Sequence, residues 1–222
     1  MACWSAENAT NAYLSTIKMG KKVKEPNVAE FISALAAGSN AQLMVMACAG
    51  IADSTILALV AAAHQTGGRV VCILRGINEL QSSKEALGLE ADCIEFFIGD
   101  AQTLLFDDHR EADFVLIDCN IENNEGIVQA VQVGRKQKGA IVLGYNALCN
   151  RSWRLSGSRT QLLPIGEGLL MTRIGAQAQA KVGGNGSPNS GKRSHWVVRV
   201  DKCTGEEHVF RIRPPQSKQI EA

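Results

Sequence analysis

Along residues 5–145, short apolar runs alternate with amphipathic stretches. The apolar runs are typical of buried strands, because Val, Ile, Leu, Phe and Met follow one another with few polar interruptions. The predicted strands are 43–46, 69–74, 94–98, 113–118 and 140–145. Apolar residues three and four positions apart predict helices over 6–19, 26–38, 54–64, 78–87 and 124–133, with Ser5 capping the first. Strands that alternate with helices in this way predict an α/β domain with a doubly wound, mostly parallel sheet.

The pattern changes after residue 145. Residues 151–160 are polar and predict a loop, and LLPIGEGLL then surrounds a turn before residues 171–174. Two apolar runs at 195–200 and 209–213 flank the turn DKCTGEE and predict a C-terminal β-hairpin. The expected parts are an N-terminal helical segment (1–25), a Rossmann-like domain (26–176), a flexible linker (177–194), the hairpin (195–215) and a disordered tail (216–222).

Composition excludes several classes of partner. The 23 Lys and Arg nearly balance the 22 Asp and Glu, so no global field favours nucleic acid or an acidic membrane surface. The seven cysteines form no CxxC pair, which favours a reducing compartment. The chain shows neither a secretory leader pattern nor an apolar stretch of roughly 18 residues. We therefore expect a soluble, cytoplasmic protein that does not enter membranes.

The loop after the first strand is the first candidate site, since ligands of open α/β sheets lie at the carboxyl ends of the strands. It contains the candidate residues Ala47, Cys48, Gly50 and Ser54. Small residues that lead into a helix N-terminus let a ligand approach unpaired N–H groups. Such loops also occur only to pack a helix against a strand, and the sequence leaves both interpretations open.

Arg75 follows the second strand. An arginine at this position can accept a phosphate on a nucleotide ribose, which makes a phosphorylated nucleotide one hypothesis. The alternative is an arginine that is only solvated at a strand end.

The order of the motifs resembles the caffeoyl-CoA O-methyltransferase-like branch of the S-adenosylmethionine-dependent enzymes. Residues 28–174 carry this resemblance, through VAEFISALAAGSNAQLMVM, GRVVCIL, IEFFIGDA, DFVLIDC, GAIVLGYNAL and LPIGEGLLMTRI. The whole chain, including MACWSAENAT and the terminal hairpin, more closely resembles a plant family known as domain of unknown function 1442. The resemblance implies the seven-stranded class I methyltransferase sheet and S-adenosylmethionine as the cofactor, without implying a substrate.

The resemblance also implies roles for three further residues. Asp100 and Ala101 match the position near the adenine amino group, although Asp100 could equally cap the following helix. Asp118 matches the first carboxylate of the divalent metal site of the enzymes. Of the further ligands only Asn146 remains, so we predict that no metal binds.

Other positions depart from the enzymes. Met46 and Leu74 stand where the enzymes have acidic residues, Gly50 is the only glycine left in its loop, and Ile121 replaces a lysine. These departures favour a non-catalytic, ligand-sensing or interaction module with a degenerate cofactor pocket. The alternative is an active S-adenosylmethionine-dependent O-methyltransferase that acts on a small molecule. No catalytic residue is predicted, the partner is a small molecule or a protein, and a homodimer is left open.

Overall fold

A computed structural model describes residues 4–19, 28–134, 139–148, 159–175, 195–200 and 207–212. Contacts divide the chain into two units, residues 1–179 and 180–222, and each is described by itself. The predicted linker (177–194) and tail (216–222) fall entirely outside the described residues, so the domain boundaries stay predictions.

The first unit contains one seven-stranded sheet in the order β3-β2-β1-β4-β5-β7-β6. Its strands are β1 (Leu43–Ala47), β2 (Arg69–Leu74), β3 (Glu95–Ile98), β4 (Phe114–Asp118), β5 (Ala140–Tyr145), β6 (Arg159–Leu163) and β7 (Leu169–Ile174). Neighbouring strands among β1 to β5 are parallel, whereas β7 runs antiparallel to both β5 and β6. The predicted doubly wound, mostly parallel sheet is confirmed.

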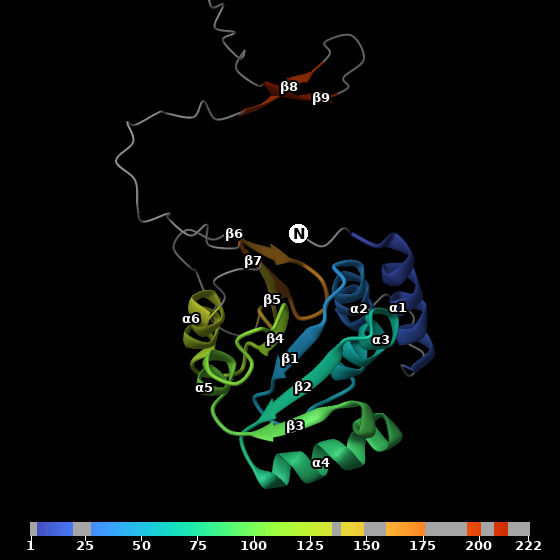
Figure 1. Ribbon diagram of the computed structural model, residues 1–222, viewed down its shortest axis with the longest axis vertical. Helices are drawn as coiled ribbons and strands as arrows, with labels where there is room; N and C mark the ends of the chain where they lie inside the picture. Colours follow the sequence, from blue (N-terminus) through green and yellow to red (C-terminus); the bar gives the residue numbers. More distant parts are fainter. Residues whose placement is uncertain are drawn as a thin grey trace, which may run out of the picture. The chain divides into compact units, whose positions relative to one another are not determined.

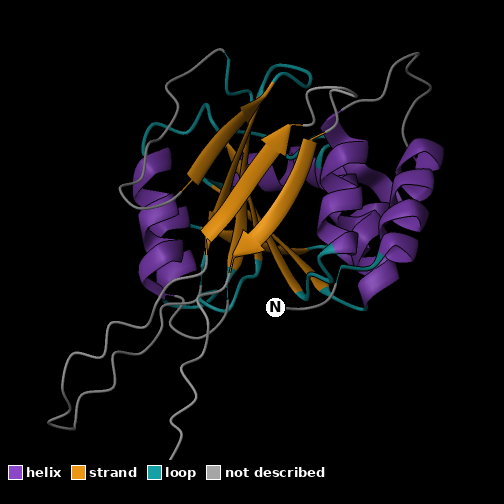
Figure 2. Ribbon diagram, turned by 90° about the horizontal axis from the view of Figure 1, so that it is seen from above, coloured by secondary structure: helices purple, strands orange, loops and turns teal. Residues whose placement is uncertain are grey.

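Helices lie on both sides of this sheet (Figures 1 and 2). They are α1 (Ala6–Met19), α2 (Val28–Gly38), α3 (Ile56–Thr66), α4 (Ile77–Leu87), α5 (Ala101–Phe106) and α6 (Asn124–Gly134), with a short 3₁₀ helix η1 (Gly88–Cys93). Successive strand residues point to opposite faces, so Phe114 packs in the core under α2 and α3, whereas Val115 packs in the core under α5 and α6. Two cores therefore hold the sheet between its helices.

Local signals explain where several elements begin. The Ser5 hydroxyl accepts a hydrogen bond from the Asn8 amide at 3.2 Å, which confirms the predicted cap of α1. The predicted loop 151–160 is wrong at its end, because Arg159 and Thr160 begin β6. Pairing with β7 explains this strand, and the hydroxyls of Thr160 and Thr172 lie 2.8 Å apart across it.

The second unit contains the predicted hairpin, with β8 (His195–Val200) antiparallel to β9 (Glu207–Ile212). The second strand begins at Glu207, two residues earlier than predicted, because Glu207 pairs with Val200. The hairpin prediction is otherwise confirmed over these residues.

His109 is a buried polar residue that the sequence pattern did not indicate. It lies at the amino end of β4, 6% exposed, with its ring edge-on to Phe97 at 4.7 Å between centroids. Its Nε2 atom has no hydrogen-bond partner among the described residues. Burial lowers the pKa of His109 from its usual 6.5 and Arg69 lowers it further, while Asp108 and Glu95 oppose the shift. The native imidazole therefore resists protonation.

We expect the free energy of unfolding to fall as the pH drops below 6.5, because the unfolded chain then takes up a proton that the native imidazole does not. Above that pH the imidazole is neutral in both states and contributes no such loss. Replacing His109 with Phe should flatten this pH dependence and stabilise the protein at pH 7 by about 1 kcal/mol, since a buried unpaired nitrogen is removed. Urea unfolding between pH 5 and 7.5 measures both effects. The exposed His64 gives the matched control, His64→Gln, and an unchanged pH profile in His109→Phe would contradict the assignment.

Candidate functional site

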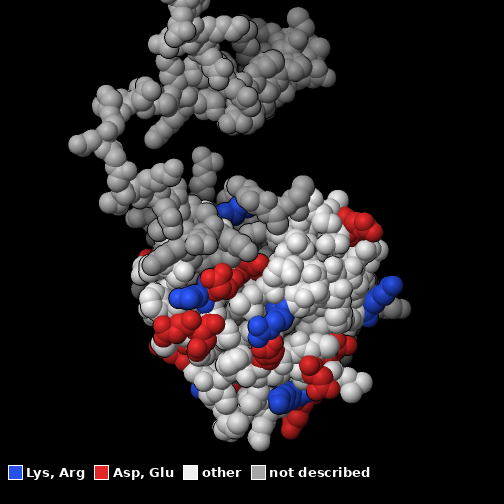
Figure 3. Space-filling view, viewed as in Figure 1, with Lys and Arg blue, Asp and Glu red and all other residues white. Residues whose placement is uncertain are grey.

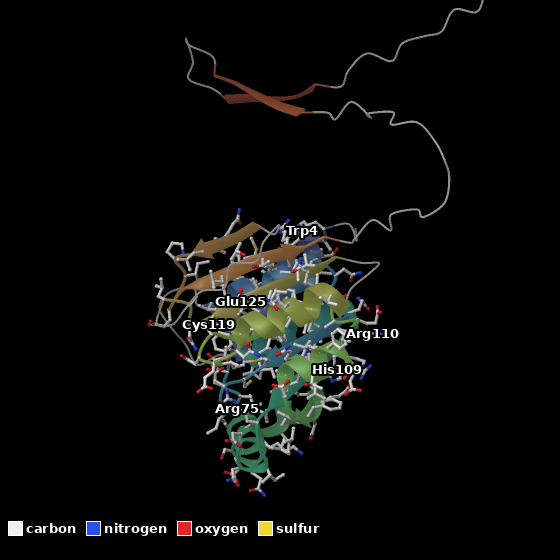
Figure 4. All side chains as sticks on the ribbon, turned by 90° about the vertical axis from the view of Figure 1, so that its left-hand side faces the viewer. Trp4, Arg75, His109, Arg110, Cys119 and Glu125 are labelled. Atoms are coloured by element: carbon white, nitrogen blue, oxygen red, sulfur yellow. The ribbon has the colours of Figure 1, made fainter. Side chains whose placement is uncertain are left out.

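The carboxyl ends of β1 to β4 meet at one edge of the sheet, because these strands are parallel. In the sheet, β2 and β3 lie on one side of β1, and β4 and β5 lie on the other side. The strand order therefore reverses between β1 and β4. This is the usual ligand position in open α/β sheets. Figure 4 shows Arg75 and Cys119, which follow β2 and β4, on one side of the domain, and His109 and Arg110 toward the other. The predicted site residues that follow β1 to β4 therefore share one edge.

The loop from β1 to α3 makes hydrogen bonds to β2 and α4 that the sequence did not suggest. The amide of Cys48 donates to the Ile73 carbonyl at 3.1 Å, and the amide of Ala52 donates to the Ser83 hydroxyl at 2.8 Å. The expectation of unpaired N–H groups is wrong for these two residues. At Gly50, by contrast, a Cβ atom would meet nothing within 4 Å. A ligand can therefore approach the backbone at Gly50.

Ser54 does not begin the helix, which starts two residues later at Ile56. The carboxylate of Asp53 instead accepts a hydrogen bond from the Thr55 amide at 2.8 Å, just before the first turn of α3. A carboxylate at a helix N-terminus satisfies both the orphan amides and the helix dipole. The predicted helix start at Ser54 is therefore two residues too early, and Asp53 disfavours a phosphate there.

The end of β2 differs most from the sequence expectation. Arg75 is exposed and forms no ion pair with the described residues, and Leu74 is buried. Glu79, in the first turn of α4, folds back toward the strand end. Its Oε2 atom lies 2.7 Å from the position that a Cβ on Gly76 would take. A carboxylate is therefore present at this strand end, although the strand itself supplies none.

Asp100 caps the helix after β3. Its Oδ2 atom accepts hydrogen bonds from the amide and the hydroxyl of Thr103, both at 2.8 Å. The interpretation of Asp100 as the cap of the following helix is thus confirmed. Ala101, the first residue of α5, is half-buried beside it. The Oδ1 atom of Asp100 makes no hydrogen bond with the described residues. The cap therefore leaves one hydrogen-bond acceptor at the carboxyl edge of the sheet.

Asp118, at the end of β4, is bonded to its own chain rather than arranged for a cation. Its Oδ1 atom accepts the backbone amide of Asn120 at 3.0 Å and the side-chain amide of Asn146 at 3.1 Å. Asn146 adopts a left-handed conformation, with φ 59°, which brings its amide to Asp118. Within the described residues no group of three or more metal-ligating side chains occurs. The donor set therefore does not suit Mg²⁺ or Ca²⁺.

Tyr145, at the end of β5, is a site residue that the sequence analysis missed, because it lies inside an apolar run. Burial raises its pKa well above the usual range, with Cys48 and Asp118 acting in the same direction. Contact with Cys72, whose sulfur lies 3.7 Å away, and burial raise the pKa of the Cys48 thiol. Burial and Asp118 raise that of Cys119 to about 12. The phenol and both thiols stay protonated, which disfavours a cysteine nucleophile.

The turn between β6 and β7 covers the end of β5. The amide of Ala147 donates to the Gly168 carbonyl at 3.0 Å, and that of Leu148 donates to the Glu167 carbonyl at 2.8 Å. Gly168 has φ 86°, and a Cβ there would lie 2.5 Å from the Leu148 side chain. The predicted turn in LLPIGEGLL is confirmed, and its glycine is required by close approach.

A family model described as "Protein of unknown function (DUF1442)" matches residues 1–212. The chain belongs to the DUF1442 family. A search of curated proteins gave no match. The family match includes both strands of the terminal hairpin, so the hairpin is part of the DUF1442 family pattern along with the sheet.

Solved structures similar to this DUF1442 chain are methyltransferases. A putative caffeoyl-CoA O-methyltransferase from Staphylococcus aureus is 16% identical, with a TM-score of 0.53 over 77% of this chain and 93% of its own. A methyltransferase from Geobacter sulfurreducens is 19% identical, with a TM-score of 0.51 over 77% and 91%. An O-methyltransferase from Bacillus cereus, crystallised with SAH, is 16% identical, with a TM-score of 0.50 over 77% and 91%. At these identities the similarity establishes the fold alone, and the predicted class I methyltransferase fold is confirmed.

Two further residues at the site of the DUF1442 chain were missed. Glu79 stands three residues after Gly76, the spacing at which a glutamate in a first helical turn folds back toward the N-cap. Ser83 lies on the apolar stripe of α4 between Leu80 and Leu87, and is fully buried. A glutamate at that spacing and a serine on an apolar stripe were the available sequence signals.

Proposed function

We propose that this chain binds an adenosyl ligand of the S-adenosylmethionine type at the carboxyl edge of β1 to β4, and acts as a ligand-sensing or interaction module without metal-assisted methyl transfer. The hydrogen bond from the Asn146 amide to Asp118 carries the proposal, because it places a donor where a metal-dependent site needs a cation. The open backbone at Gly50 supports ligand binding. Similar folds have been crystallised with SAH or SAM.

The residues at the edge suit a nucleoside better than a phosphate. Gly50 leaves the backbone accessible, Ile77 is 57% exposed beside Arg75, and one oxygen of Asp100 has no partner among the described residues. An exposed apolar side chain and a free acceptor are what an adenine ring and its amino group require. Asp53 before the first turn of α3 repels an anion.

An active O-methyltransferase is the second candidate. It is favoured by Asp118, which is 8% exposed, pairs with Tyr145 across β4 and β5, and has an Oδ2 atom that makes no hydrogen bond with the described residues. When bound, S-adenosylmethionine supplies an electrophilic methyl group. The part of this chain would be to accept, at Asp118, the proton that leaves the hydroxyl of an acceptor molecule.

Calorimetry with S-adenosylhomocysteine and S-adenosylmethionine tests the proposal. We expect both to bind, and we expect no methylated product by mass spectrometry when the protein is incubated with small phenols and catechols, with or without Mg²⁺. No heat at high protein concentration would overturn ligand binding. Methyl transfer would establish the second candidate instead.

Replacing Gly50 with Val separates ligand binding from folding. No protein atom lies within 4 Å of the added Cβ, so we expect the free energy of unfolding to change by about 0.5 kcal/mol or less. The added side chain would occupy the space through which the ligand approaches, so affinity for S-adenosylhomocysteine should fall by about tenfold or more. Calorimetry and urea unfolding on the same sample measure the two effects. Unchanged affinity would place the ligand elsewhere.

The proposal also covers the kind of partner and the cellular compartment. Lys and Arg side chains lie next to Asp and Glu side chains on the face shown in Figure 3, so this face offers no uniform field for nucleic acid. Among the described residues, no helix combines the length and the apolar character needed to cross a bilayer. We propose a small molecule or a protein as the partner, and the cytoplasm as the compartment.

A further inference from the structure

We infer that Glu79 accepts hydrogen bonds from the ribose hydroxyls of the adenosyl ligand, an inference that rests on the proposed function. Glu79 is half-buried, and its carboxylate forms no hydrogen bond or ion pair with the described residues. Its Oε2 atom lies 2.7 Å from the Cβ position of Gly76, directly after β2. A partly buried carboxylate without a partner, at a strand end on the ligand edge, is suited to receive donors from a ligand.

The backbone around Glu79 is held against the loop that follows β1. Gly76 is extended, with φ −157° and ψ 175°, and its lack of a Cβ leaves the place that Oε2 occupies. The carbonyl of Glu79 accepts the Ser83 hydroxyl at 2.6 Å, and that hydroxyl accepts the Ala52 amide at 2.8 Å. The first turn of α4 is therefore bonded to the loop that follows β1. The two parts of the candidate site are held in one arrangement.

A ribose fits this carboxylate chemically. Its two neighbouring hydroxyls are donors, and a carboxylate accepts such a pair through charge-assisted hydrogen bonds. In nucleotide-binding α/β folds an acidic residue at the end of the second strand performs this role. Here the acid comes from the helix that follows, so the loss suggested by Leu74 is compensated by Glu79.

Glu79 also decides between ribose and ribose phosphate. A phosphate on either hydroxyl would place a second negative charge against the carboxylate, in a partly buried setting. The exposed Arg75 offsets little of this repulsion, since its charge is solvated. The site therefore selects an adenosyl ligand with an unphosphorylated ribose.

Calorimetry tests this with S-adenosylhomocysteine and its 2′-deoxy analogue, on the wild-type chain, Glu79→Gln and the control Glu85→Gln. Glu85 is exposed on the same helix. We expect Glu79→Gln to bind S-adenosylhomocysteine about tenfold more weakly, and the preference of the wild type for the 2′-hydroxyl to disappear. Glu85→Gln should bind as the wild type does.

Each outcome has a distinct meaning. If the wild type binds S-adenosylhomocysteine and Glu79→Gln binds it equally well, the role of Glu79 is overturned while the proposed function stands. If Glu79→Gln weakens both ligands by the same factor, Glu79 acts on the loop rather than on the ribose, and the inference fails. If the wild type binds neither ligand, the proposed function fails with it. Melting curves of all three proteins show that the variants are folded.

Discussion

Asn146→Asp should destabilise the protein and at the same time create a response to divalent cations. The substitution replaces the amide that donates to Asp118 at 3.1 Å with a second carboxylate, so a hydrogen bond to a charged group is lost and like charges meet. We expect a loss of about 2–3 kcal/mol in the free energy of unfolding. Two carboxylates at one strand edge are the hard ligands that Ca²⁺ and Mg²⁺ prefer. Millimolar CaCl₂ should therefore restore much of the stability, as measured by thermal melting.

Asn146→Gly is the matched control. It removes the amide but tolerates the φ of 59°, so it isolates the lost hydrogen bond from backbone strain. We expect this variant to be destabilised by about 1 kcal/mol or more and to show no response to CaCl₂. The wild type should not respond either. If calcium stabilises the wild type as much as Asn146→Asp, the proposed absence of a metal site is wrong.

Ser83→Ala should destabilise the protein and weaken ligand binding together. The Ser83 hydroxyl is fully buried and joins the Ala52 amide to the Glu79 carbonyl. Removing it leaves a buried N–H group without a partner, which costs about 1–3 kcal/mol. In a domain of this size each kcal/mol lowers the melting temperature by about 2–4 °C. Because the same bond fixes the loop at Ala52, affinity for S-adenosylhomocysteine should fall as well.

Ser82→Ala provides the comparison, since Ser82 is the preceding residue on α4 and makes no hydrogen bond with the described residues. It should change the free energy of unfolding by about 0.5 kcal/mol or less. Urea unfolding and calorimetry on both variants give the test. Equal effects of the two substitutions would show that the Ser83 hydroxyl does not join the two parts of the site.

The candidate site was only partly predictable, and the reason differs from residue to residue. Gly50 was predicted because it lies in the loop after an apolar strand, and Asp118 because the resemblance implied a carboxylate at the end of another strand; parallel strands bring both positions to one edge. Ser83 was missed because its hydrogen bond joins α4 to Ala52 in a distant loop, whereas Glu79 is only three residues from Gly76 and its spacing was an available signal. The predicted helix start at Ser54 was wrong because α3 begins at Ile56 with Thr55 as its N-cap, and the Asp53 carboxylate accepts the Thr55 amide.

The sequence by itself determined the layered α/β fold. Continuous apolar runs such as 69–74 can be buried only between two layers of helices, and the helical periodicity of the intervening stretches supplies those layers. The positions of β1 to β5 and of the C-terminal hairpin followed from the same local pattern, apart from their exact ends.

Only the tertiary structure decided which polar groups meet. Asn146 reaches Asp118 because β5 lies beside β4, and Ser83 accepts the Ala52 amide because α4 lies against the loop after β1. Hydrogen bonds of this kind depend on a few tenths of an ångström between elements far apart along the chain, whereas burial of apolar residues depends only on their periodicity.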